Sequence, residues 1–443
     1  MDGGGVISSI VSVPRGACAS RPVRYEVSKE ELELVSRRAA DDDDVVELPG
    51  FPKELWLRDD EEGPTEEGPT EDDMDDEDDE EDLDDTDLRS TDAIFLAAKT
   101  EEDLSCVEMH LYDGDSFYVH HDVTLPAFPL ALEWLRLGGG AAAATQGSFA
   151  AVGTFETNVE IWNLDVLDAL EPTASLGQQD TTTTKKKKKK KTKKTKKTKK
   201  PEEESSHSDA VAALSWNRLT SNALASGSAD KTVRLWDLAT DDEPRCAAAF
   251  AAKGRVQSVK FHPSEAAALA YGGDDKAVHV RDCRSKDAVS DLPPLSGEVE
   301  CLAWNPTNPA HLVASCDDGV VACFDVRHAA NGPCWTLGRP HGKAAVSSVA
   351  FNDLGLLGTA SHDKTVQLFD VRPGTKPDDA RLASRAMAIG KLFALAFDEG
   401  DPFLLAAGGS KATVALWETT ENSNVARFQQ QAEASAAPAS APA

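Results

Sequence analysis

The sequence is short of the features that mark secreted, membrane-spanning and metal-rich proteins. Its eight cysteines in 443 residues include no C-x-x-C pair, a usage typical of reduced thiols inside the cell. The one near match to a glycosylation acceptor, Asn305-Pro306-Thr307, contains the forbidden proline. No apolar run is long enough to span a bilayer, and the apolar segment 6–13 lacks the basic flank of a signal peptide. We therefore expect a soluble protein of the cytosol or nucleus with no membrane partner.

The motifs of the common enzyme classes are also missing. There is no G-x-x-x-x-G-K-[ST] loop, no H-E-x-x-H pair and no G-x-S-x-G turn. The neighbours His120 and His121 invite a metal site, but adjacent residues of a strand are expected to point to opposite faces and then cannot hold one ion together. We expect no catalytic residue, no cofactor, no bound metal and no small-molecule substrate, and hence a protein that is not an enzyme.

Positive charge is scarce outside a single tract. The 46 lysines and arginines face 77 acidic residues, which gives a net charge of -31. Residues 59–88 contain 20 acidic residues and no basic one, whereas residues 185–200 contain 13 lysines and no acid. These two tracts together carry -7, so the rest of the chain carries -24. The part of the chain outside the two tracts is therefore acidic, and it repels a phosphate backbone and favours basic partners such as histones, ribosomal proteins or arginine-rich tails.

A repeated pattern predicts the fold. A turn, a short alternating strand and an aromatic residue followed by an acid occur at Ser228-Ala-Asp-Lys-Thr-Val-Arg-Leu-Trp-Asp237 and again at Ser361-His-Asp-Lys-Thr-Val-Gln-Leu-Phe-Asp370. Seven positions fill the slot of the aromatic residue, which we call the blade anchor: Tyr112, Trp162, Trp236, Arg281, Phe324, Phe369 and Trp417. Their spacings are 50, 74, 45, 43, 45 and 48, and the 74 falls to about 45 without residues 177–205. A period near 40–45 with this signature is typical of WD40 blades. The sequence therefore predicts an all-β, seven-bladed WD40 β-propeller with disordered acidic and lysine-rich insertions.

An acid lies six residues before four of the anchors. These blade-turn residues are Asp230, Asp275, Asp318 and Asp363. In WD40 repeats such an Asp accepts hydrogen bonds from its own turn and often from a His, for which His207 and His341 are candidates. A ring of catalytic or metal-binding carboxylates is the alternative, but repetition at one blade position favours a structural role. In the last blade Lys411 replaces the Asp, which predicts a looser blade.

The first blade lacks a first strand near its other three, which are predicted at 93–99, 106–112 and 117–123. The segment 6–13 has the alternation of a first strand and is predicted to supply it, because an open ring would leave unpaired sheet edges. Residues 14–90 would then be a short helix from Ser28 to about Arg38, begun by a capping box, and a disordered acidic insertion. The propeller is expected over 91–430, with a disordered lysine-rich loop at 177–205, and 431–443 as a disordered tail.

Several motifs in a fixed order resemble one family. They are Val13-Pro-Arg-Gly16, Asp115-Ser-Phe-Tyr-Val-His-His-Asp122, Val159-Glu-Ile-Trp-Asn-Leu-Asp165, Leu170-Glu-Pro172 and, after the lysine insertion, Asp209-Ala-Val-Ala-Ala-Leu-Ser-Trp-Asn217. Together they resemble the periodic tryptophan protein 1 family of eukaryotic WD40 proteins over nearly the whole chain. The resemblance implies a protein of the nucleus and nucleolus that acts in large-subunit ribosome assembly and pre-ribosomal RNA processing, and that associates with chromatin at ribosomal DNA. It implies pre-ribosomal particles as partners.

The lysine tract is a candidate signal for nuclear localisation or a site of non-specific RNA contact. Its members are Lys185, Lys186, Lys187, Lys188, Lys189, Lys190, Lys191, Lys193, Lys194, Lys196, Lys197, Lys199 and Lys200. A solvated loop is the alternative, and the absence of aromatic residues and arginines argues against base-specific recognition. The acidic insertion either binds basic clients or keeps the protein soluble.

Three functions are therefore compatible with the sequence. The first is a scaffold in ribosome biogenesis, and the second is a histone- or chromatin-binding protein, which the acidic body favours. The third is a substrate receptor of a ubiquitin ligase, suggested by Asp282-Cys-Arg284, Asp325-Val-Arg327 and Asp370-Val-Arg372. An arginine after a blade's third strand can also pair only locally, which would remove the basis for the third function.

Overall fold

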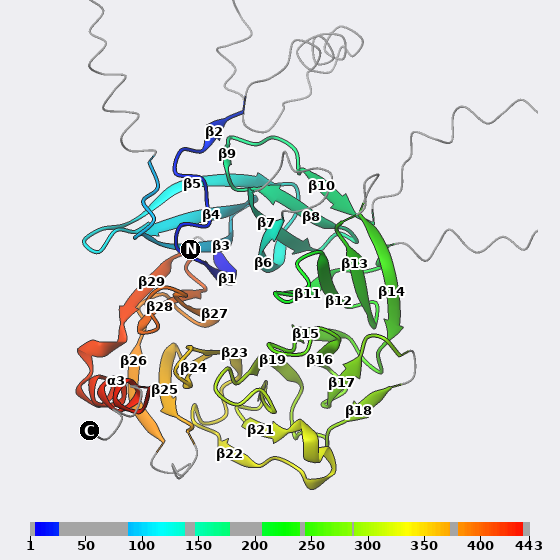
Figure 1. The fold of residues 1–443 in the computed structure, drawn as a ribbon, viewed down its shortest axis with the longest axis vertical. Helices are drawn as coiled ribbons and strands as arrows, with labels where there is room; N and C mark the ends of the chain where they lie inside the picture. The colour runs from blue at the N-terminus through cyan, green and yellow to red at the C-terminus, as the bar shows by residue number, and fades with distance from the viewer. Residues whose placement is uncertain are drawn as a thin grey trace, which may run out of the picture. The chain divides into compact units, whose positions relative to one another are not determined.

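The described part of the chain is a ring of seven blades (Figure 1). The computed structural model describes residues 5–25, 87–137, 147–177, 206–239, 244–285, 288–372 and 380–436. The chain divides into two compact units, one of residues 24–87 and one of residues 1–23 and 88–443. The ring lies in the unit of residues 1–23 and 88–443. The predicted seven-bladed propeller is thereby confirmed. None of the described helices is both long and apolar enough to cross a membrane.

Each blade is an antiparallel sheet whose strands run outward from the axis in chain order. Blades one to three consist of β1 (Val6–Val13), β3 (Ala93–Glu101), β4 (Leu104–Tyr112) and β5 (Phe117–Leu125); β6 (Pro129–Leu137), β7 (Gly147–Thr154), β8 (Val159–Asn163) and β10 (Ala174–Leu176); and β11 (Val211–Trp216), β12 (Ala223–Ser228), β13 (Thr232–Asp237) and β14 (Arg245–Ala251). Blades four to seven consist of β15 (Val256–Phe261), β16 (Ala268–Gly273), β17 (Val278–Asp282) and β18 (Val289–Asp291); β19 (Val299–Trp304), β20 (His311–Cys316), β21 (Val321–Asp325) and β22 (Trp335–Gly338); β23 (Val346–Phe351), β24 (Leu356–Ser361), β25 (Thr365–Asp370) and β26 (Arg381–Ala386); and β27 (Leu392–Phe397), β28 (Leu404–Gly409) and β29 (Val414–Glu418). The remaining elements are the short strands β2 (Val23–Arg24) and β9 (Val166–Leu167), the 3-10 helices η4 (Val326–Asn331) and η6 (Thr419–Glu421), and the helix α3 (Ser423–Ala436).

The apolar core is divided among the interfaces between neighbouring blades. One cluster, for example, joins Val233 of blade three to Val256 and Leu269 of blade four, and another joins blade four to blade five. The seven anchors all lie on third strands, and six of them are buried. In blade four the anchor is Arg281, whose guanidinium lies 3.9 Å from the centre of the Phe250 ring of blade three. A stacked cation over an aromatic ring thus replaces the aromatic residue of the other blades.

At several blade interfaces the neighbouring blades approach so closely that the second strand carries glycine at the contact. A Cβ on Gly227 would lie 2.5 Å from a methyl group of Val256 in blade four, and one on Gly408 would lie 2.4 Å from a methyl group of Ile7 in blade one. The latter contact shows that the last and first blades pack as tightly as an ordinary pair. Gly is required at these positions because any side chain would push the blades apart.

The residue that follows the first strand links one blade to the next. The Asn217 side-chain amide donates to Ala266 O at 2.7 Å, His262 Nε2 donates to Pro309 O at 2.9 Å, and the Asn352 amide donates to Pro402 O at 2.8 Å. In blade seven this position is Asp398, which accepts two hydrogen bonds from Arg15, at 3.0 Å from Nε and 2.8 Å from Nη2. The ring is closed by an ion pair at the place where other blades use a neutral bond.

No strand is shared across the closing interface. The strand predicted at Val6–Val13 is β1, which pairs with β3 inside blade one, and the described residues of blade seven form three strands only. The contact between the two blades includes an apolar cluster with Ile7, Ile10 and Leu404, the Arg15–Asp398 pair, and a bond of 2.7 Å from the Tyr112 hydroxyl to Glu418. Side chains rather than a sheet therefore hold the last blade to the first.

Helix α3 packs on the outer side of blades six and seven (Figure 1). Its buried side chains Val425, Phe428 and Ala432 lie in the core cluster of these blades, and the Arg372 guanidinium lies 4.1 Å from the centre of the Phe428 ring. The helix continues through residues 431–436, where a disordered tail was expected, because Ala432 extends the apolar stripe begun by Val425. Residues 437–443, the predicted helix from Ser28, residues 59–86 of the acidic tract and the lysine tract lie outside the described residues.

Replacing Asp398 with alanine should destabilise the whole ring. Asp398 is buried and also accepts from Ser12 Oγ and the Asp401 amide, so its removal leaves the Arg15 cation without its partner. We expect a loss of about 3 kcal/mol in the free energy of unfolding. Urea unfolding followed by tryptophan fluorescence measures it. Asp353→Ala, an exposed carboxylate just after the equivalent position of blade six, should change stability by less than about 0.5 kcal/mol. Equal effects of the two substitutions would contradict the role of the ion pair.

Candidate functional site

The central channel is lined by the first strands of all seven blades and encloses a volume of about 440 Å³. Every first strand has a shift of register near its start, after the second residue in β1 and after the first residue in the other six strands, and the residue that follows is a bulge. These bulge residues, all in the channel lining, are Ser8, Leu130, Ala212, Gln257, Glu300, Ser347 and Phe393. They form a ring near the start of the first strands, which we call the bulge ring.

Some members of the bulge ring form hydrogen bonds between neighbouring blades, and others are available to a ligand. Ser8 Oγ donates to Pro129 O and Ser347 Oγ donates to Leu392 O, each at 2.7 Å and each across a blade interface. Within the described part of the chain, no cation pairs with Glu300. Burial, followed by the charges of Asp317 and Glu298, raises the pKa of the Glu300 carboxyl. This mouth of the channel therefore favours a ligand that brings positive charge.

Charged residues gather at the opposite mouth, where the first strands end. Arg218 of blade three pairs with Glu399 of blade seven across the axis, and Lys260 lies 3.8 Å from Glu133. Asp353 adds a further carboxylate to this part of the lining. Acids outnumber bases in the channel as in the chain as a whole, so the lining is suited to binding a polar or basic group.

The blade-turn Asp is part of a buried network in blades three and six. Asp230 accepts from the Thr232 amide at 2.8 Å and from Nδ1 of His207 at 2.9 Å, and His207 Nε2 lies 2.7 Å from Ser226 Oγ. The same Ser226 oxygen accepts from the anchor Trp236 at 2.8 Å. In blade six, Asp363 lies 2.9 Å from His341 Nδ1, and His341 Nε2 lies 2.8 Å from Thr359 Oγ1. The network fixes the turn, the entering loop and the anchor relative to one another.

The other two blade-turn residues have different partners. Asp275 lies 2.7 Å from Nε2 of His279, a residue of the third strand of its own blade. Asp318 accepts from Ser296 Oγ at 2.5 Å and from Arg339 Nη2 at 2.8 Å. The structure does not bring the four carboxylates together, because each serves its own blade. Lys411 of blade seven donates to the backbone oxygen of Ala388 instead.

The prediction for His120 and His121 is wrong in its geometry. The register of β4 with β5 shifts between Met109 and His110, so that His120 becomes a bulge without a partner opposite it. The bulge turns the two rings toward each other, and their Nδ1 atoms lie 2.8 Å apart. Burial and the charge of His120 lower the pKa of His121 to about 4. Strict alternation of faces fails at a bulge, which the sequence did not reveal.

The three Asp-x-Arg segments form local pairs. Arg284 Nη2 lies 2.7 Å from Asp282, and the same distance joins Arg327 to Asp325 and Arg372 to Asp370. Each arginine also donates its backbone amide to the same Asp. These contacts account for the motif without an external partner.

The bulge ring was not predicted from the sequence. No one residue type is common to all seven members, which are the third residue of β1 and the second residue of each of the other six first strands. The lysine tract falls between β10 and β11, in the connection from blade two to blade three.

Comparison with known proteins begins with the repeats. Residues 199–237 and 332–370 match the family model described as WD domain, G-beta repeat. These two segments contain the first three strands of blades three and six, the blades that hold the complete His–Asp network.

Relatives match most of the chain. It is 34% identical over 338 residues to an uncharacterised WD repeat-containing protein of Schizosaccharomyces pombe, 31% over 328 residues to the periodic tryptophan protein 1 homolog of Drosophila melanogaster, and 31% over 376 residues to periodic tryptophan protein 1 of Saccharomyces cerevisiae. The matches cover 75%, 72% and 75% of this chain and 62%, 66% and 64% of the relatives, so the chain spans just under two thirds of their length. A shorter match, 28% identical over 126 residues and covering 27% of each chain, is to the ribosome biogenesis protein WDR12 homolog of Chlamydomonas reinhardtii.

Asp230→Asn should destabilise the protein in a way that depends on pH. Burial alone would raise the pKa of Asp230, but the bonds from His207, Thr232 and the Ser208 amide outweigh it and hold the pKa far below the ordinary value. The stability that this carboxylate provides is present above the ordinary carboxyl pKa of about 3.9 and is lost as the pH falls toward the lowered one. We expect a deficit of about 2 kcal/mol at neutral pH that shrinks below about pH 4.

Urea midpoints of the wild type and the variant across this range provide the measurement. Asp103→Asn changes an exposed carboxylate in the corresponding turn of blade one and should leave stability within about 0.5 kcal/mol. A deficit of constant size down to about pH 3 would show that the charge of Asp230 is not what stabilises the turn.

Proposed function

The chain belongs to the periodic tryptophan protein 1 family of WD40-repeat proteins, and from this membership we propose that it is a non-enzymatic scaffold of ribosome biogenesis. The observation that carries the proposal is the match of most of the propeller to these relatives, with a partial match to a protein named for ribosome biogenesis. The finer proposal is that it supports ribosomal RNA processing and large-subunit assembly in the nucleolus.

The charge of the molecule supports a basic assembly partner. The chain carries -31, and the channel lining has the unpaired Glu300 at one mouth and more acids than bases at the other. Ribosomal proteins and assembly factors carry lysine- and arginine-rich segments, which such an acidic surface attracts, whereas it repels a phosphate backbone. The propeller would contact protein components of a pre-ribosomal particle, and any contact with ribosomal RNA would be local.

The lysine tract is assigned to nuclear and nucleolar delivery. A run of 13 lysines within residues 185–200, between two blades of an acidic ring, is the strongest basic feature of the chain. Lysine-rich segments of this kind are read by import receptors and also hold RNA through phosphate contacts. Delivery and assembly are thus carried by separate parts of the molecule.

A second candidate function is the binding of histones or chromatin at ribosomal DNA. The same acidic charge favours it, since histone tails are as basic as those of ribosomal proteins. A role as ubiquitin-ligase receptor has less support, because Arg284, Arg327 and Arg372 are engaged by their neighbouring aspartates.

Glu300→Lys should release the protein from large-subunit precursors. The substitution places a cation in the bulge ring where a basic ligand would bind. Tagged full-length protein expressed in a eukaryotic cell is followed on sucrose gradients, and at least a tenfold drop in co-migration with precursor particles is expected. Glu265→Lys makes the same change of charge on an exposed turn outside the channel and should migrate as the wild type.

Deletion of residues 185–200 separates the two roles. The deletion should reduce nuclear accumulation, while protein fused to an unrelated import signal should still co-migrate with precursors. Failure of the wild type to co-migrate, together with salt-sensitive retention on nucleosomes, would replace the ribosome proposal with the chromatin one.

A further inference from the structure

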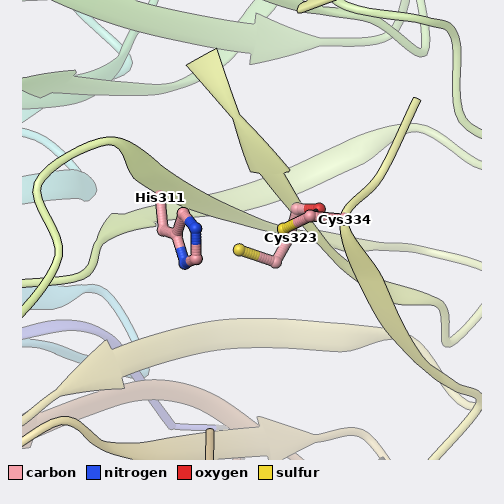
Figure 2. Close-up of side chains that lie close together, drawn as sticks. All are labelled: His311, Cys323 and Cys334. Atoms are coloured by element: carbon pink, nitrogen blue, oxygen red, sulfur yellow. Dashed lines mark hydrogen bonds between the residues drawn. The ribbon is translucent and has the colours of Figure 1, made fainter. Parts of the chain in front are cut away.

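Three side chains of blade five gather on one face of its outer strands. His311 is the first residue of β20, Cys323 is the third residue of β21, and Cys334 directly precedes β22. One ligand atom from each side chain lies within 4.8 Å of the others, and Figure 2 shows the imidazole and the two sulfurs turned toward the same space. The Cys334 amide donates to Cys323 O at 2.8 Å, which fixes the two cysteines side by side.

The other blades have apolar residues at two of these three positions. The residue before the anchor is Cys323 in blade five, and in the six other blades it is Leu111, Ile161, Leu235, Val280, Leu368 and Leu416. His311 pairs with the residue after the anchor, a place taken elsewhere by Phe149, Ala223, Ala268, Leu356 and Leu404. Packing of a blade therefore requires neither a thiol nor an imidazole at these positions.

His311 also differs from the buried histidines of the molecule. Four of the five buried histidines, His207, His262, His279 and His341, have hydrogen-bond partners at both ring nitrogens, and the fifth, His110, has Glu108 at Nε2. Among the residues that the structure describes, no hydrogen-bond partner reaches the half-buried ring of His311. The two sulfurs lie within 4.8 Å of one of its ring nitrogens, and thiols are only weak hydrogen-bond partners for an imidazole.

We propose that His311, Cys323 and Cys334 bind one thiophilic cation, with zinc as the physiological candidate. One imidazole nitrogen and two sulfurs form a ligand set that zinc favours over magnesium or calcium, which prefer oxygen. Zinc–ligand distances of about 2.0–2.3 Å place ligand atoms roughly 3.5 Å apart in a tetrahedron, so atoms that now lie within 4.8 Å of one another need to approach by up to about 1.3 Å. We expect rotation of the cysteine and histidine side chains to provide this approach.

The chemistry of binding follows from the three ligands. Both sulfurs bind as thiolates, so the two thiol protons leave to solvent as two metal–sulfur bonds form, while the imidazole binds in its neutral form. The exposed side chain of Cys334 gives the cation a path from solvent, and Cys323 is buried beneath it. The fourth position of the tetrahedron remains for water or a donor of a partner molecule. The bound ion would cross-link the three outer strands of blade five.

Cobalt(II) tests the site on the reduced full-length chain after treatment with a chelator. Tetrahedral cobalt with thiolate ligands absorbs through charge transfer from sulfur and through visible d–d bands, neither of which the protein has alone. We expect one Co²⁺ bound per chain, displacement of its absorption by added Zn²⁺, and a higher unfolding temperature with Zn²⁺ present.

Substitutions taken from the other blades provide folded variants. Cys323→Val and His311→Leu insert residue types that the same positions hold elsewhere in the ring, and each should weaken Co²⁺ binding at least tenfold and abolish the shift in unfolding temperature. Cys246→Ser changes a half-buried cysteine on the outer strand of blade three and should bind as the wild type. Absence of the charge-transfer band in the reduced wild type, or a band of equal strength in Cys323→Val, would overturn the proposal.

Discussion

A propeller whose apolar core is divided among the interfaces between neighbouring blades depends on the one interface that chain order does not provide. Six interfaces join blades that follow each other in sequence, but the seventh joins strands made from opposite parts of the chain. Here the buried Asp398 carboxylate and the Arg15 guanidinium, 383 residues apart, close the ring together with the apolar contacts of Ile7 and Ile10. An ion pair half shielded from water is strong only when both partners are present, so the closure is sensitive to either one. The channel, the bulge ring and the packing of Gly408 all presuppose this contact.

The sequence predicted what repeats in it. Seven anchors at a nearly constant spacing were enough for the fold class, and the alternation of residues 6–13 was enough to place a first strand, because both are local patterns. In blades three and six the blade-turn Asp has the histidine partner that was predicted, because His207 and His341 precede the first strand of their blades. What repeats within one chain can be recognised without knowing which segments touch.

Features that depend on pairing or on distant contacts were not predictable. The bulges at His120 and in all seven first strands arise from the register between two strands. The type of the bulged residue does not indicate that a bulge will form there. The role of Asp398 could not be predicted, because its partner Arg15 is 383 residues away in sequence. His311, Cys323 and Cys334 lack the short spacing by which metal ligands are usually recognised in a sequence. Helix α3 was not predicted, because its apolar stripe is only three residues long.

Strand β1 has a consequence for the order in which the protein is assembled during synthesis. It is made before any other strand of the ring, yet its hydrogen-bonding partner β3 begins 80 residues after β1 ends, and its packing partners in blade seven come after every other blade. Until then Ile7 and Ile10 lack the blade-seven part of their apolar cluster, and the growing chain is an open arc of blades with an uncovered blade at each end. The ring is therefore completed in a single late step, in which β1, the first strand to be synthesised, packs against the strands of blade seven, which are synthesised last.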